Sequence, residues 1–297
     1  MSRNSRLIIV IALVVVLAAD LAALGYAFTR GGGEHLPRYP GRIAVRAGCG
    51  LEHMFFDGKD KKTMCLQDVF DDVSVSRNGK ALAWDTRRGD AILVAGVDGA
   101  NPASISVPPG ISAVPSLAPD GKKVAFLHSP HDDGKYDIWV TSTTVPNAEQ
   151  VTNTRNVSDV AWSPNGDRLA YIQNWSDETL EGQLSLIDAD GGGARALVDG
   201  DSPDWSPDGK KIVYVHDGSI WTIDADGTDR HLLIRDGHSP AWSRDGQLVA
   251  FLRTEKCSRS ICPERLYLAF ADGTKPQEVG PVYPGDRRVL WLPDPFE

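Results

Sequence analysis

Basic patches are missing from this sequence of 297 residues. Lys and Arg number 31 against 40 Asp and Glu, which gives a net charge of −9, and no stretch gathers Lys and Arg into a continuous run. A surface that follows a phosphate backbone needs such a run. Nucleic acid is therefore not an expected partner.

Long apolar runs are also missing, except at the N-terminus. Residues 7–28 are apolar apart from Asp20 and are long enough, at about 20 residues, to cross a bilayer as a helix. Arg3 and Arg6 precede this run without an acidic neighbour, so the positive-inside rule keeps residues 1–6 in the cytoplasm. The sequence therefore predicts a transmembrane signal-anchor, with the rest of the chain outside the cytoplasm.

A cleaved signal peptide is the alternative for this segment. Its apolar core is residues 7–19, and the small residues Gly25 and Ala27 suit a cleavage site. The anchor is favoured because the apolar run resumes after its single acid. In both cases a short tether at 29–40 leads to an extracytoplasmic domain at 41–297, which is membrane-anchored in the first case and secreted in the second.

Cysteine is scarce as well, and none lies in or just after the apolar segment, which excludes a lipid anchor on an N-terminal cysteine. The four cysteines are Cys49, Cys65, Cys257 and Cys262. An even count in an exported domain favours disulfides, and pairing sequence neighbours (49 with 65, 257 with 262) is the simplest of three connectivities. A zinc site with four thiolates is the alternative, but its tight two-residue spacings are missing.

Helical periodicity is missing from the exported part. Its apolar residues form short alternating runs rich in Val, Ile, Leu, Tyr and Trp, with turn signals between them. We therefore expect an all-β domain.

One turn motif recurs five times in these runs. The copies are VSVSRNGKALAWD, VPSLAPDGKKVAFLH, DVAWSPNGDRLAYIQ, SPDWSPDGKKIVYVH and SPAWSRDGQLVAFLR, and their turn glycines Gly79, Gly121, Gly166, Gly209 and Gly246 are 42, 45, 43 and 37 residues apart. Each copy is followed by another alternating strand and a second turn, as in SIWTIDADGTDRHLLI. Four short strands in about forty residues are typical of a β-propeller blade.

The two ends of the domain complete each other. Five full units cover residues 72–279. Before them, strands without the turn motif are predicted from GRIAVRAG onward. After them, a degenerate hairpin around Gly285 is predicted in VYPGDRRVLWLP. We expect a six-bladed propeller whose closing blade combines N-terminal and C-terminal strands, because this leaves no exposed edge. A monomer is expected.

The Asp-Gly pair of the motif is predicted to be a turn and not a catalytic site. Asn78 and Asn165 replace the aspartate in two of the five copies, and Asn lacks the proton chemistry of Asp. A residue that tolerates positive φ, followed by glycine, is what a tight hairpin needs. The recurring Trp162, Trp205 and Trp242 precede this turn at a fixed register, which favours a packing role.

The second turn carries paired carboxylates in Asp188-Ala-Asp190-Gly and Asp224-Ala-Asp226-Gly. Calcium loops use this spacing, but they continue with further oxygen ligands, and here the chain returns directly to a strand. Hairpin chemistry is favoured, and no cofactor is expected.

The repeated WS-P-D/N-G, followed by a strand such as KKIVYV, resembles the TolB-like family of WD-like β-propeller repeats over residues 41–292. The resemblance implies a periplasmic or cell-surface propeller that binds other proteins. TolB itself carries a further N-terminal domain and works with the Tol-Pal envelope system. Here the repeats follow the apolar segment after a short tether, which departs from that pattern.

Signatures of an enzyme are weak. The strings nearest to a nucleophile elbow, GDSPD at Gly200 and GHSPA at Gly237, lack the closing glycine. A metal-dependent lyase remains an alternative through His128 and His131, which stand near two aspartates. A small-molecule or glycan sensor that uses the propeller channel is another alternative.

Three loops differ most from their counterparts in the repeat, namely residues 129–136, 174–182 and 255–265. Irregular loops on a regular scaffold are where binding specificity is expected. The candidate contact residues are His131, Asp132, Asp133, Trp175, Asp177, Glu178, Arg259 and Arg265. The sequence therefore predicts a non-enzymatic scaffold of the cell envelope that binds another envelope or secreted protein.

Overall fold

The computed structural model describes residues 41–55, 57–105, 107–145, 147–176, 178, 181–255, 262–282 and 288–293. The described residues all belong to one compact unit, Arg38–Glu297. The expected anchor at 7–28 and tether at 29–40 lie outside the described residues. Within the described ranges no helix has the length and apolarity needed to span a membrane.

All regular structure in the described part is β-strand, which confirms the all-β prediction. The first strands are β1 (Arg42–Ala47), β2 (Gly50–Phe55), β3 (Lys62–Cys65), β4 (Val69–Val75), β5 (Ala81–Thr86), β6 (Ile92–Gly96), β7 (Ala103–Ile105), β8 (Ile111–Leu117), β9 (Lys123–Ser129), β10 (Asp137–Ser142) and β11 (Glu149–Gln150). The others are β12 (Val157–Trp162), β13 (Arg168–Ser176), β14 (Glu181–Asp188), β15 (Arg195–Trp205), β16 (Lys211–His216), β17 (Ser219–Asp224), β18 (His231–Ile234), β19 (His238–Trp242), β20 (Leu248–Thr254), β21 (Glu264–Phe270), β22 (Gln277–Val282) and β23 (Val289–Leu292).

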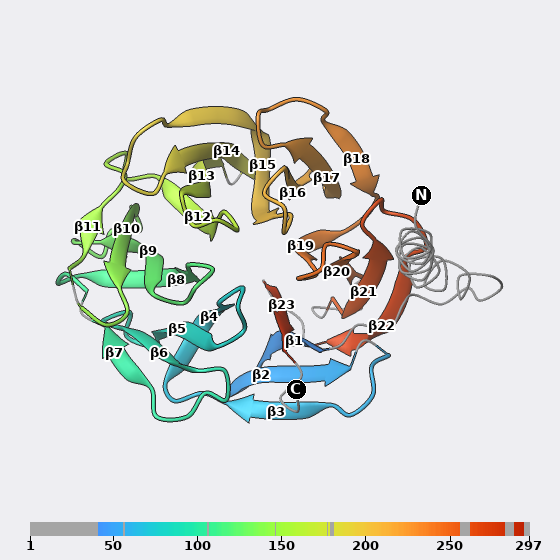
Figure 1. The fold of residues 1–297 in the computed structure, drawn as a ribbon, viewed down its shortest axis with the longest axis horizontal. Coiled ribbons are helices and arrows are strands. Elements are labelled where there is room, and N and C mark those ends of the chain that lie inside the picture. The colour runs from blue at the N-terminus through green and yellow to red at the C-terminus, as the bar shows by residue number, and fades with distance from the viewer. Residues whose placement is uncertain are drawn as a thin grey trace, which may run out of the picture. The chain divides into compact units, whose positions relative to one another are not determined.

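These strands form a propeller, with antiparallel sheets arranged around a central axis (Figure 1). Four sheets have four strands each, in the orders β23-β1-β2-β3, β4 to β7, β8 to β11 and β19 to β22. The fifth sheet has seven strands, β12 to β18. Among the described residues the strands therefore form five sheets, and not the six separate sheets that the repeat count suggested.

The long strand β15 explains the seven-stranded sheet. Its first half pairs with β14, with Gly182 opposite Gly200, and its second half pairs with β16, with Trp205 opposite Ile212. The chain stays extended at Gly200, where a Cβ atom would lie 2.5 Å from the Tyr214 ring and 2.7 Å from the Val215 carbonyl oxygen. Two consecutive repeats thus share one continuous strand.

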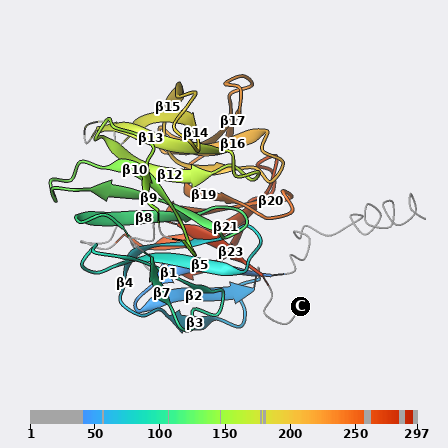
Figure 2. The ribbon, with the colours of Figure 1, turned by 60° about the vertical axis from the view of Figure 1, so that its left-hand side comes forward.

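The expected closure by the two ends of the chain is present. Strand β23 pairs antiparallel with β1, with Arg42 opposite Leu292 and Val45 opposite Val289, and both views show the two strands side by side (Figures 1 and 2). The hairpin expected around Gly285 lies outside the described residues. Pairing between the ends covers two edges that would otherwise be exposed.

The hydrophobic core lies between neighbouring sheets, and the repeated tryptophans are part of it. Trp205 is fully buried, and Trp162 and Trp242 are almost so. The Trp162 indole donates a hydrogen bond to the Ser116 carbonyl of the neighbouring inner strand at 2.9 Å. The packing role expected for these side chains is confirmed.

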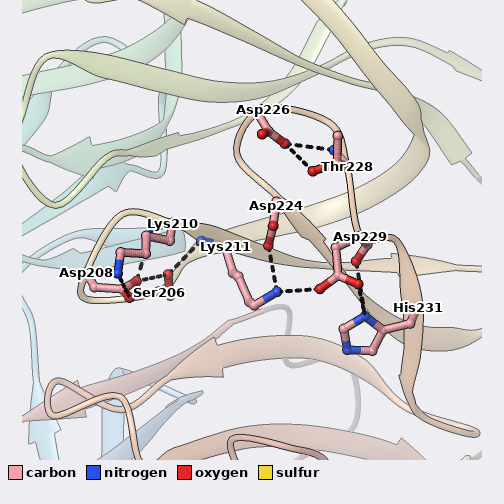
Figure 3. Close-up of polar contacts among 9 residues, drawn as sticks. All are labelled: Ser206, Asp208, Lys210, Lys211, Asp224, Asp226, Thr228, Asp229 and His231. Atoms are coloured by element: carbon pink, nitrogen blue, oxygen red, sulfur yellow. Dashed lines mark hydrogen bonds and ion pairs between the residues drawn. The ribbon is translucent and has the colours of Figure 1, made fainter.

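The aspartate of the motif is used by its own turn (Figure 3). Ser206 Oγ donates to Asp208 Oδ1 at 2.7 Å, and the Lys210 amide donates to the same oxygen at 3.1 Å. Gly209 has φ +69°, which glycine adopts without strain. These contacts confirm the turn prediction.

The second turn uses its carboxylates in the same way (Figure 3). Asp226 Oδ1 accepts from the Thr228 amide at 2.9 Å and from its hydroxyl at 2.6 Å, while Asp224 pairs with Lys211 Nζ at 2.6 Å. Across the described ranges, no group of three His, Cys, Asp or Glu side chains is arranged to hold a metal ion. These hydrogen bonds account for the spacing that resembles a calcium loop.

Cys49 and Cys65 form a disulfide, the pairing expected from the sequence, with their Cα atoms 4.8 Å apart. It joins the β1–β2 turn to the end of β3, within the sheet that closes the ring. Cys262 is also disulfide-bonded, while Cys257, its expected partner, lies outside the described residues.

Candidate functional site

The inner strands β4, β8, β12, β15 and β19, together with β23, surround a central channel (Figure 1). A cavity of about 160 Å³ lies in this channel and is lined from all six strands. Its lining includes carboxylates, guanidinium groups, serines, prolines and three tryptophans. Polar and apolar side chains are therefore mixed in the lining of this cavity.

Each of the five inner strands that carry the repeat is irregular at nearly the same place. The pairing register shifts within β4, β8, β12, β15 and β19. Val114, Ser202 and Ser239 occupy equivalent positions before a proline, with φ of +50°, +49° and +51°. Positive φ is uncommon outside glycine and is an outlier for a β-branched residue. Bulges of this kind redirect side chains, here beside the channel.

Four carboxylates gather around one guanidinium group near these bulges. Arg288 directly precedes β23; its Nε lies 3.2 Å from Asp72 Oδ1, and its Nη2 pairs with Asp159. Asp204 Oδ2 accepts a hydrogen bond from the Trp242 amide at 2.7 Å. Asp201 also interacts electrostatically with Arg288. The charges come from β4, β12, β15 and the residue before the closing strand.

The pKa values of Asp159, Asp201 and Asp204 are raised. Burial raises the pKa of Asp159 to about 6; Arg288 opposes this rise, and the Asp201 and Asp72 carboxylates add to it. Burial also raises the pKa of Asp201 and of Asp204. The positive charge of Arg288 therefore does not offset the effect of burial on the pKa of these carboxylates.

The other end of the cavity carries arginines. Arg77 Nη2 donates to the Trp205 carbonyl at 2.9 Å, and Arg244 Nε donates to the Arg77 carbonyl at 2.9 Å. Both arginines belong to the repeated turn motif, where the inner strands end. Asp72 and Asp159 lie earlier in their inner strands, so these two carboxylates lie toward the start of the inner strands and the two arginines lie toward the motif, where Arg77 also interacts with Asp204.

The three irregular loops share a place in the fold. Residues 129–136 join β9 to β10, residues 174–182 join β13 to β14, and residues 255–265 join β20 to β21. Each connects the second and third strand of its repeat, and antiparallel strands put that turn at the end opposite the motif. The loops thus lie on the face where the inner strands begin, which we call the loop face.

The candidate residues in the first loop have separate roles. Asp133 accepts from Ser129 Oγ at 3.0 Å and pairs with Arg155, while His131 and Asp132 are exposed. His128, the proposed metal partner of His131, is buried, and its Nδ1 lies 3.0 Å from Ser112 Oγ. The two histidines therefore occupy different environments.

The other two loops present an aromatic residue and an ion-paired arginine. Trp175 is 40% exposed, and Glu178, three residues later, is also exposed. Arg265 pairs with both Glu255 and Glu278. Asp177 and Arg259 lie outside the described residues.

Sequence reasoning missed the channel carboxylates. Asp72 and Asp159 both stand three residues before the motif's tryptophan position, where two other copies have serine and one has valine. An aspartate at the same position in two copies of the repeat could have indicated the channel cluster. It was hidden because turn aspartates are frequent throughout the repeats.

The comparisons with solved structures agree with the propeller fold. The structure is similar to TolB from Acinetobacter baumannii, with a TM-score of 0.70 and 21% identity over 87% of this chain and 68% of that one. It is also similar to a putative TolB from Agrobacterium tumefaciens, with a TM-score of 0.66 and 18% identity over 86% of this chain and 99% of that one. At these identities the likeness shows the fold alone.

Among curated proteins, the "Uncharacterized peptidase YuxL" of Bacillus subtilis (strain 168) is 32% identical over 108 residues. The match covers 33% of this chain and 16% of that protein, so the chain spans only a small part of that relative.

The sequence also matches the TolB beta propeller domain over residues 50–280, which is most of the chain. The chain therefore belongs to the TolB β-propeller domain family.

Proposed function

We propose that this chain is a non-enzymatic scaffold that binds another envelope or secreted protein at its loop face. One observation carries the proposal: three loops that depart from the repeat share the face toward which Asp72 and Asp159 lie. Specificity is commonly carried by loops on a rigid scaffold. The proposed ring has six blades, with the seven-stranded sheet counted as two that share β15.

The contacts of the described residues favour binding over catalysis. The Ser112 and His128 pair is buried, so no substrate can reach its hydroxyl. Ser202 and Ser239, from the two strings nearest to a nucleophile elbow, lie within inner-strand bulges. The peptidase name of the curated relative belongs to a protein of which this chain matches 16%.

A small-molecule or glycan sensor that uses the channel is the second candidate. The cavity of about 160 Å³ favours it, although ligand pockets usually enclose about 300–1,000 Å³. The cavity is therefore better matched to one inserted side chain or a small ion than to a sugar chain. A metal-dependent lyase is less favoured still, because its two proposed histidine ligands are separated into buried and exposed environments.

Proximity labelling and affinity capture with the full chain test the proposal. The loop-face variant combines Trp175→Ala with Asp132→Ala, and the control combines Lys122→Ala with Lys210→Ala in the motif turns, where both lysines are 80% exposed. We expect a reproducible partner that the loop-face variant loses and the control keeps. Equal capture by both variants would overturn the assignment of the face.

We also propose that residues 7–28 anchor the chain in a membrane, with the propeller on the extracytoplasmic side. The disulfide between Cys49 and Cys65 supports an oxidising compartment. Protease treatment of cells stripped of their outer layers but with an intact cytoplasmic membrane, and of lysed cells, tests the orientation. Digestion of the propeller only after lysis would contradict it, and a mature chain that begins near residue 28 would favour secretion.

A further inference from the structure

A single arginine connects the closing strand to two distant strands. Arg288 immediately precedes β23, which pairs with β1, and its guanidinium pairs with Asp72 of β4 and with Asp159 of β12. The ring is therefore closed twice, by the β23–β1 hydrogen bonds at its edge and by an ion-pair cluster in its channel.

The charge of this cluster does not balance. Asp201 and Asp204 of β15 join Asp72 and Asp159, and the further charged groups that act on them are Arg77 beside Asp204 and Glu181 beside Asp201. The lining from β8 and β19 includes the uncharged Ser116, Pro119, Ser239, Pro240, Ala241 and Trp242, with Arg244 after β19 at the far end. With every group ionised, the carboxylates outnumber the guanidinium groups around them.

Two of these carboxylates are poorly solvated. The side chains of Asp72 and Asp159 are only 10% and 18% exposed. Burial of neighbouring negative charges raises the free energy of the ionised carboxylates. This free energy falls when one of the carboxylates takes up a proton.

We propose that this cluster is a proton-sensitive closure element, in which mild acidification places a proton from solvent on a carboxylate oxygen of Asp159, relieves the repulsion among the four carboxylates and thereby stabilises the closed ring. Arg288 then interacts with three ionised carboxylates in place of four. The device concerns closure of the ring and does not depend on the proposed partner.

The direction of the effect follows from linkage. Burial raises the pKa of Asp159 to about 6 in the folded chain, above the ordinary value of 3.8 that applies when the chain is unfolded. Between these values the folded state binds more protons, so the contribution of this group to stability grows as the pH falls through 6. Above the folded pKa that contribution is absent.

Three histidines act in the opposite direction in the same pH range. Burial lowers the pKa of His53, His128 and His238 below the ordinary histidine value of 6.5. Each of them therefore lowers the free energy of unfolding as the pH falls below 6.5. The melting temperature of the wild-type chain alone is therefore no test. The difference between the wild type and a variant that lacks only the Asp159 carboxylate isolates the proposed group.

The experiment compares the full-length wild type with Asp159→Asn and with Asp217→Asn. Asp217 is an exposed turn residue with φ +49°, a conformation that Asn also tolerates, and it serves as the matched control. Thermal unfolding is measured at pH 7.5 and at pH 5.0. We expect the melting temperature of the wild type to rise relative to Asp159→Asn by roughly 3–5 °C on acidification, and Asp217→Asn to follow the wild type.

Parallel pH profiles of the wild type and Asp159→Asn would overturn the proposal. A direct titration of the wild type by carboxyl-carbon NMR covers the case in which the variant fails to fold. An aspartate side chain with a midpoint near 6 supports the proposal, and midpoints below about 4.5 for every aspartate contradict it.

Discussion

Arg77 donates a hydrogen bond to the main-chain carbonyl of Trp205, 128 residues further along the chain, at 2.9 Å. The first residue follows the inner strand β4, and the second ends the inner strand β15. This contact joins two strands that are not neighbours in any sheet. Side chains thus hold the inner strands together across the channel, in addition to the packing between adjacent sheets.

Replacement of Arg77 by alanine is expected to lower stability. The variant loses the charged hydrogen bond to Trp205 and the positive charge beside Asp204. Such a bond contributes about 1.5–3 kcal/mol, and the melting temperature should fall by roughly 3–8 °C. Thermal unfolding measures this loss. Arg88→Ala, at an exposed position, is the control; equal losses in the two variants would show that the cross-channel contact contributes nothing specific.

Replacement of Arg288 by methionine should be more damaging. Methionine keeps much of the side-chain volume but leaves Asp72 and Asp159 desolvated without their counter-ion. Breaking a buried ion pair on one side costs about 3–5 kcal/mol. Denaturant unfolding at pH 7.5 measures the change. The double variant Arg288→Met/Asp159→Asn should recover part of the loss, and a double variant no more stable than the single one would speak against charge as the cause.

Two tryptophans allow buried and exposed positions to be compared. Trp205 is fully buried between sheets, whereas Trp175 is 40% exposed on the loop face. We expect Trp205→Ala to reduce the free energy of unfolding by about 3–5 kcal/mol and Trp175→Ala to change it by less than about 1 kcal/mol. Denaturant titration of both variants tests this, and a large loss for Trp175→Ala would assign that residue to the core.

The turn role of Asp208 predicts an order of effects. Its Oδ1 accepts hydrogen bonds from Ser206 and Lys210, and an amide oxygen can accept the same bonds. Asp208→Asn should therefore be nearly neutral, and Asp208→Ala should cost about 1 kcal/mol. Gly209→Ala should cost about 1–2 kcal/mol because φ is +69° there. Melting temperatures in the reverse order would contradict the turn assignment.

The sequence predicted the repeating parts of the fold best. Glycines at regular spacing marked the turns, and the incomplete repeats at the two ends indicated the pairing of β23 with β1. Periodicity did not predict that two repeats share β15. The space at Gly200, where a Cβ atom would clash with Tyr214, is set by the neighbouring strand and not by the local sequence.

The candidate site was only partly predictable. The irregular loops were identified from sequence because they break the repeat, and their common face follows from strand order. The channel cluster depends on bulges that redirect Asp72 and Asp159, and on Arg288 from a degenerate repeat. Sequence patterns do not reveal which of many aspartates lose their solvent, since this is decided by strands far apart in the chain.

The shared strand β15 has a consequence for how the ring opens. Its amides bond to β14 in the first half and to β16 in the second, so neither sheet half can separate without disturbing the other. Hydrogen exchange of residues 195–205 should therefore report one cooperative opening unit that extends from β12 to β18. We expect the remaining four sheets, which share no strand with one another, to give separate exchange rates.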